Sequence, residues 1–134
     1  MNKSTAAKFL RISYWVGAVF DGLVVIPLLL PRVAGDAFGI PNFSPGNDYV
    51  YASYIAASLM LGWVSLLIWA DRKPAERRGV LLLTIFPVLT GLIISGFSAV
   101  TTNLIDKMLP IWIIQGVLVL LFGLSYLIAN KLDV

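Results

Sequence analysis

Five polar residues could form a binding site within long apolar stretches of this chain. They are Asp21, Tyr54, Ser58, Thr90 and Gln115. If the stretches are helices that cross a membrane, these residues lie within about one helical turn of the same depth. Their carboxyl, hydroxyl and amide groups could hydrogen-bond a lipophilic ligand, and Asp21 could take up a proton. The sequence therefore predicts a candidate ligand-binding site near the middle of the membrane.

Asp21 has two interpretations, and the sequence leaves both open. A charged carboxylate in the middle of a membrane costs on the order of 2.5–3.5 kcal/mol on insertion scales, so it should face protein or enclosed water. It could be a neutral anchor that hydrogen-bonds Gln115 or a hydroxyl group of a neighbouring helix. It could instead be the ligand or proton site itself. Gly17 and Ala18 lie about one turn away on the same stretch and leave room for a neighbouring helix.

Several kinds of chemistry are excluded by composition. The chain has no Cys and no His. Thiol redox chemistry, thiolate metal sites, haem ligation by imidazole and a histidine-based triad are therefore impossible within it. The other acidic residues lie in predicted loops or the tail: Asp36, Asp48, Asp71, Glu76, Asp106 and Asp133. We predict no catalytic residue, no metal site and no cofactor.

Four long apolar runs position the candidate site. They cover residues 9–30, 49–70, 80–100 and 110–129. A bilayer core about 30 Å thick needs roughly 20 helical residues at about 1.5 Å each, and every run meets that length. The hydrophobic fraction of 59% and charged fraction of 13% also differ from soluble domains. We predict an all-α fold, an integral membrane up-down-up-down four-helix bundle, with a single membrane domain over residues 1–134.

Local signals predict where these helices start and bend. Pro74 suits the first turn of a helix and Glu76 suits its positive end, so the third helix is expected to start near residue 74. Asp48 is expected to cap the second span. Pro87 cannot donate a backbone hydrogen bond and leaves the carbonyl of Leu83 free, which predicts a kink in the third span.

Small residues recur four apart, a spacing that lets membrane helices approach closely. The pairs are Ala52 with Ala56, Ser53 with Ala57, Ser58 with Gly62, and Gly91 with Ser95. We expect these faces to pack against neighbouring helices. Bulky residues at Ala56 or Gly91 are expected to disrupt the bundle.

Positive charge is concentrated on one side of the predicted bundle. That side, with both termini and the second loop, has eight of the ten basic residues: Lys3, Lys8, Arg11, Arg72, Lys73, Arg77, Arg78 and Lys131. The other side has Arg32 and Lys107. Because short loops rich in Lys and Arg stay in the cytoplasm, both termini are predicted to be cytoplasmic. The expected partners are membrane lipids, with anionic headgroups near the second loop, and no nucleic acid.

The second span and the loop after it resemble a known family. The segments AASLMLGW (56–63), LLIWADRKPAERR (66–78) and GVLLLTIFP (79–87) are similar to a family of small four-span membrane proteins of bacteria and archaea. The resemblance implies the four-span architecture and the cytoplasmic membrane of a prokaryote. It implies no activity and no functional residue.

Two functions fit these observations. The leading hypothesis is a small structural or accessory membrane protein that packs with itself or with a larger membrane complex. The alternative is a carrier or binding protein for a lipophilic small molecule or a proton, with its site around Asp21. An enzyme acting on lipids lacks a second acid or base at membrane depth, so we predict that the chain is not an enzyme.

Overall fold

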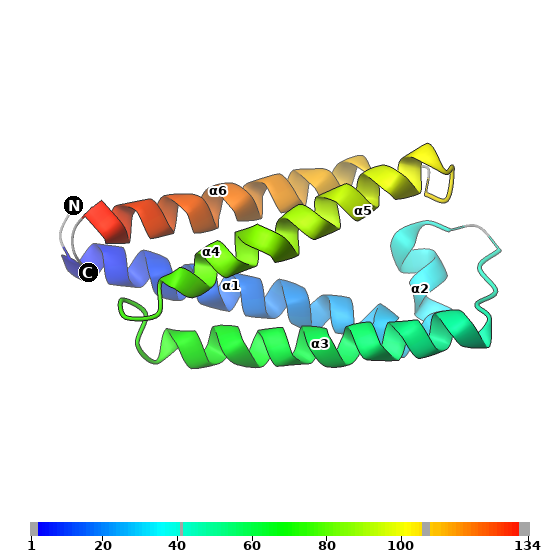
Figure 1. Cartoon of the computed structure of the whole chain (residues 1–134), viewed down its shortest axis with the longest axis horizontal. Coiled ribbons are helices and arrows are strands. Elements are labelled where there is room, and N and C mark those ends of the chain that lie inside the picture. Colours follow the sequence, from blue (N-terminus) through cyan, green and yellow to red (C-terminus); the bar gives the residue numbers. More distant parts are fainter. Residues whose placement is uncertain (1–2, 41, 106–107, 132–134) are drawn as a thin grey trace.

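The structure, a computed structural model, describes residues 3–40, 42–105 and 108–131, and it is helical without strands over this part of the chain (Figure 1). In chain order the elements are α1 (Lys3–Leu29), α2 (Pro31–Phe38), α3 (Asn47–Asp71), α4 (Gly79–Leu83), the π-helical segment η1 (Thr84–Leu89), α5 (Thr90–Thr101) and α6 (Leu109–Lys131). The predicted all-α fold is confirmed.

Four helical stretches of the described residues are long and apolar enough to cross a membrane. They are most of α1, all of α3, the stretch Gly79–Thr101 that joins α4, η1 and α5, and α6. This chain is a multi-pass membrane protein, and we refer to Gly79–Thr101 as the third span. The end of the bundle where α1 begins and α6 ends is called the inner end here, and the opposite end the outer end (Figure 1).

Helix α1 is the centre of the bundle. It packs along α3 on one side and against α6 on another, whereas the third span packs mainly on α6 and reaches α3 chiefly through α4. Figure 1 shows α5 diverging from α3 toward the outer end. The helices α3 and α5 therefore lie apart at the outer end, where Figure 1 shows α2 between them.

The close packing of α1 depends on Gly17. A Cβ atom added at Gly17 would lie 3.1 Å from both Leu67 Cδ1 and Phe122 Cζ. Leu67 belongs to α3 and Phe122 to α6, and both side chains are buried in the core. The glycine thus lets three helices meet at one level, and the sequence prediction that Gly17 leaves room for a neighbour is confirmed.

The third span bends where Pro87 predicts. Phe86 has φ −119° and ψ 108°, outside the helical region, and it separates the inner part of the span from α5. Thr90 Oγ1 donates to the carbonyl oxygen of Ile85 at 2.9 Å, so the side chain satisfies an acceptor beside the bend. The predicted kink is confirmed.

The start of the third span differs from its prediction. Helix α4 begins at Gly79 and not near Pro74, because the loop before it is folded into turns held by other helices. Tyr14 Oη donates to the carbonyl oxygens of Arg77 at 3.0 Å and Pro74 at 3.4 Å. Arg77 in turn donates to the carbonyl of Trp69 and lies 3.4 Å above the centroid of its ring.

The first outer loop contains a helix that the sequence analysis did not predict. Helix α2 is followed by the capping residue Gly39, whose φ of +65° is left-handed and favours glycine. Ile40 N donates to Gly35 O at 2.8 Å beside this cap. The predicted cap was wrong: Asp48 lies in the first turn of α3, and the N-cap is Gly46, which has no side chain to accept a bond. Asp48 still carries its negative charge at the positive helix end.

Candidate functional site

Asp21 and Gln115 each provide an enclosed acceptor atom that has no hydrogen-bond donor among the described residues. Asp21 is half-buried on α1, and its Oδ2 is enclosed. Gln115 on α6 is 7% exposed, and its Oε1 is enclosed as well. Neither atom has a hydrogen-bond partner within the described part of the chain. Buried polar atoms usually have such partners, so the pair is unusual.

These two acceptors lie at nearly the same depth. Ser13 of α1 and Ser125 of α6 share a hydrogen bond of 2.8 Å between their Oγ atoms, which fixes the register of two antiparallel helices. Asp21 is eight residues outward of Ser13, about 12 Å along α1, and Gln115 is ten residues outward of Ser125, about 15 Å along α6. Asp21 also lies one turn from Gly17, whose backbone faces α6.

A third polar atom without a partner lies farther outward on the same helix. Trp112 Nε1 is enclosed and lacks an acceptor among the described residues. It is one turn from Gln115 and packs on Gly96, where an added Cβ would lie 3.0 Å from this nitrogen. Within the described residues, the middle and outer parts of the bundle therefore carry two enclosed acceptors and one enclosed donor without a partner.

The other predicted site residues are not joined to Asp21 and Gln115 by hydrogen bonds among the described residues. They are Tyr54, Ser58 and Thr90. Tyr54 is half-exposed and Ser58 is exposed, with its Oγ donating to the carbonyl of Ile55 at 2.8 Å. Thr90 donates to Ile85 beside the bend. In the structure as described, no hydrogen bond joins these three residues to Asp21 or Gln115. Depth along a helix can be counted from sequence, but the direction of each side chain depends on how the helix is rotated.

The small-residue faces divide into packed and open ones. Ser53 and Ala57 are buried on α3, as predicted. Gly62 on α3 and Gly91 on α5 are exposed, and an added Cβ at either would meet nothing within 4 Å. Ala52, Ser58 and Ser95 are exposed, and Ala56 is half-buried. The prediction that Gly91 packs against another helix of this chain was therefore wrong.

An apolar groove lies between α3 and the third span. It has a volume of about 270 Å³ and is lined by Ala56, Leu59, Met60, Trp63 and Val88. Trp63 Nε1 donates to Thr84 Oγ1 at 3.3 Å and so joins the two walls. Gly91 of α5 follows Val88 by about one helical turn.

A polar network at the inner end was not predicted from the sequence. Asp71, interpreted there as a loop acid, is the last residue of α3, and its side chain is only 12% exposed. Its Oδ1 accepts from Arg11 Nε at 2.9 Å, and its Oδ2 accepts from Arg11 Nη2 at 3.3 Å and Trp15 Nε1 at 3.2 Å. An acid after an apolar run and an arginine near the start of another were the available signals, but nothing in sequence paired them.

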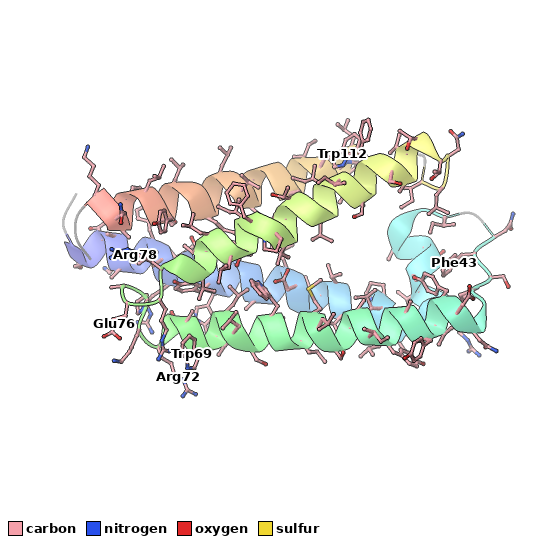
Figure 2. All side chains as sticks on the ribbon, in the orientation of Figure 1. Phe43, Trp69, Arg72, Glu76, Arg78 and Trp112 are labelled. Carbon is pink, nitrogen blue, oxygen red and sulfur yellow. The ribbon has the colours of Figure 1, made fainter. Side chains whose placement is uncertain are left out.

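The charged residues gather at the inner end. Figure 2 shows Trp69, Arg72, Glu76 and Arg78 together there, with Phe43 and Trp112 near the outer end. Lys73 Nζ forms an ion pair with Glu76 at 2.9 Å. Asp106, Lys107 and Asp133 lie outside the described residues. No group of three or more acidic residues that could hold a metal ion occurs in the part of the chain that was described.

In comparisons with known proteins, no family model, no curated protein and no solved structure matches this chain. The structural features that bear on its function are the groove, the two buried acceptors and the inner network.

Proposed function

We propose that this chain is a small structural or accessory membrane protein that packs with a second copy of itself or with a larger membrane complex. The groove between α3 and the third span carries the proposal, because it is apolar and open to the side. Gly91 of α5, about one helical turn beyond the lining residue Val88, leaves space that no described residue fills. A transmembrane helix of a partner is the expected occupant. No reaction is assigned to the chain.

The chemistry of this face suits helix packing in lipid. Association between membrane helices depends on close van der Waals contact, and small residues permit it. Gly91 offers that contact about one helical turn beyond the groove residue Val88, since an added Cβ there would meet nothing within 4 Å. Ser58 and Ser95 donate to carbonyls of their own helices, at 2.8 Å to Ile55 and 3.0 Å to Leu92, so they need no partner to satisfy them.

The inner end is proposed to face the cytoplasm of a prokaryotic cell. The basic side chains of Lys8, Arg11, Arg72, Arg77 and Arg78 support this orientation, since short basic loops remain on the cytoplasmic side. The likeness of residues 56–87 to a four-span family of bacteria and archaea supports the choice of cell.

Crosslinking in native membranes tests the assembly function. A single cysteine at Leu59, which is exposed and lines the groove, should be joined to a second copy or to another membrane protein by a bismaleimide. The native chain has no cysteine to interfere. A cysteine at Leu124, exposed on α6, is the matched control and should give little product.

A blocking substitution completes the test. Gly91→Leu should reduce crosslinking at Leu59 by about tenfold, as expected when about 1.4 kcal/mol of close packing is lost. Gly116→Leu is the control, because Gly116 is exposed on α6 and an added Cβ there also meets nothing within 4 Å. Equal crosslinking at Leu59 and Leu124, or insensitivity to Gly91→Leu, would contradict the proposal.

A second candidate function rests on Asp21 and Gln115. Two enclosed acceptors at one depth suit a lipophilic molecule with hydrogen-bond donors, or a proton carried by Asp21. Native mass spectrometry of the purified chain should then show a co-purifying small molecule that Asp21→Asn removes. A pH-sensitive dye in proteoliposomes should report proton uptake that the same variant abolishes. If the variant folds and changes neither result, Asp21 is a structural residue.

A further inference from the structure

A stripe along one side of α1 changes from basic to apolar as it leaves the inner end. Lys8, Arg11, Trp15 and Val19 lie three or four residues apart, so they share one side of the helix. All four are exposed. Ser13, which contacts α6, is two residues from Trp15, about 200° around the helix axis at 3.6 residues per turn. The stripe therefore faces away from α6.

The middle of the stripe is held rigid by α3. Arg11 and Trp15 both bond Asp71, with donor–acceptor distances of 2.9, 3.3 and 3.2 Å. The Arg11 side chain remains 61% exposed, and within the described residues its Nη1 makes no hydrogen bond. A guanidinium and an indole fixed before binding lose less conformational entropy when a ligand arrives.

An apolar groove begins at the same tryptophan. It has a volume of about 250 Å³ and is lined by Trp15, Val16, Val19 and Phe20. These residues run outward from Trp15, which is one turn from Arg11, about 6 Å along the helix. Arg11, at the membrane surface, is thus followed directly by an apolar groove at the depth of the acyl chains.

We propose that this stripe binds one anionic phospholipid of the leaflet at the inner end, with its phosphate at Lys8 and Arg11 and an acyl chain in the groove behind Trp15. Asp71 balances one positive charge in the ion pair, and Lys8 supplies the excess because no ion pair or hydrogen bond involves it within the described residues. A soluble anion would use only the basic part of the stripe. The apolar groove that continues from it favours a lipid.

Quenching of Trp15 fluorescence by lipids brominated in the acyl chain tests the proposal. The chain has four tryptophans, so the signal of Trp15 is the difference between the native protein and Trp15→Phe. In mixed micelles, brominated phosphatidylglycerol should quench Trp15 at about five-fold lower mole fraction than brominated phosphatidylcholine. That factor corresponds to about 1 kcal/mol for one basic residue near an anionic headgroup.

Charge variants identify the site. Lys8→Gln should bring the two lipids to nearly equal quenching, and its fold should be intact because Lys8 is exposed. Lys131→Gln is the matched control, since Lys131 is also exposed at the inner end but belongs to α6. It should preserve the five-fold preference, and added inorganic phosphate should not displace the brominated lipid.

Three results would overturn the proposal. The two lipids could quench Trp15 equally in the native protein. Lys131→Gln could remove the preference as fully as Lys8→Gln, which would show general charge attraction. Inorganic phosphate could abolish the preference, which would show a simple anion site without a role for the groove.

Discussion

The inner and outer halves of the bundle differ in whether their enclosed polar atoms are hydrogen-bonded. At the inner end Asp71 accepts three hydrogen bonds from Arg11 and Trp15, and Ser13 pairs with Ser125. Farther outward, the enclosed polar atoms of Asp21, Trp112 and Gln115 have no partners within the described part of the chain. The helices follow the same division, because α3 and the third span meet near α4 and then diverge (Figure 1).

This difference separates the polar groups that stabilise the fold from those that are available to a partner. In the inner half, Asp71 and the pair Ser13–Ser125 are hydrogen-bonded between helices, and Gly17 lets α1 pack closely on α3 and α6. Farther outward, three enclosed polar atoms are not used by the described residues. From this contrast we expect substitutions in the inner half to destabilise the fold more than substitutions at the unsatisfied polar atoms farther outward, and the following substitutions test that expectation.

The largest effect is expected at Gly17. Gly17→Leu adds a side chain where even a Cβ would lie 3.1 Å from Leu67 and Phe122, so the three helices must separate. Overpacked cores lose about 1–3 kcal/mol, and we expect the upper end of that range. Thermal unfolding in detergent measures the loss. Gly116→Leu should leave the melting temperature unchanged, and equal melting of both variants would show that α1 is not the centre of the bundle.

Asp71→Ala should have the next largest effect. The substitution leaves Arg11 and Trp15 without their acceptor. The cost should be limited to about 1–2 kcal/mol, because both side chains can still reach the membrane–water interface. Asp71→Asn is the control: it retains an acceptor oxygen and should lose less stability. The same unfolding measurement applies. If Asp71→Ala melts like the native protein, the inner network does not stabilise the fold.

Gln115→Leu should cost little or stabilise the protein by up to about 1 kcal/mol. Among the described residues its Oε1 has no donor to lose, and an apolar side chain of similar size removes an unsatisfied acceptor. Ser125→Ala, in contrast, breaks the bond to Ser13 and should cost about 0.6 kcal/mol, the average for hydrogen bonds between membrane helices. A loss at Gln115 greater than that at Ser125 would reveal a partner for the amide and remove the distinction between the two halves.

The smallest effect on stability is expected from single-cysteine variants that report which end of the bundle faces the cytoplasm. Cysteines at Ser4 and Ala75 mark the inner end, and a cysteine at Ser44 marks the outer loop. None should alter stability, because each position lies in a partly or fully exposed segment. An impermeant maleimide added to intact cells should label Ser44→Cys only. Labelling of Ala75→Cys from outside would reverse the proposed orientation.

The spans and the bend were predictable because their causes are local. A run of apolar residues long enough to cross a bilayer forms a helix whatever its neighbours are. Pro87 likewise interrupts backbone hydrogen bonding by its own structure. The late start at Gly79 was not predictable, since the preceding loop is held by Tyr14, which lies more than sixty residues earlier in the chain.

The level of each candidate site residue along its helix could be counted from the sequence, but the direction in which its side chain points could not. Asp21 and Gln115 were identified as polar residues at one level, and the structure encloses acceptor atoms of both. Tyr54 and Ser58 lie on exposed parts of α3, because counting residues does not reveal how that helix is rotated. The ion pair of Arg11 with Asp71 joins residues 60 apart, and it depends on the register in which α1 and α3 pack.

Because the third span bends at Phe86, a small rotation of α5 about this bend would be amplified at the outer tip of the helix. Its inner neighbours α4 and η1 are attached to α6, with Trp63 of α3 bonded to Thr84, whereas α5 itself packs chiefly on η1 and α6. The 12 residues of α5 give an arm about 18 Å long. A rotation of about 10° at the bend would move its outer tip by about 3 Å, roughly half the pitch of a helix. A substitution beside the bend, such as one that removes the hydroxyl of Thr90, would thus act at a distance, on the position of the outer tip of α5.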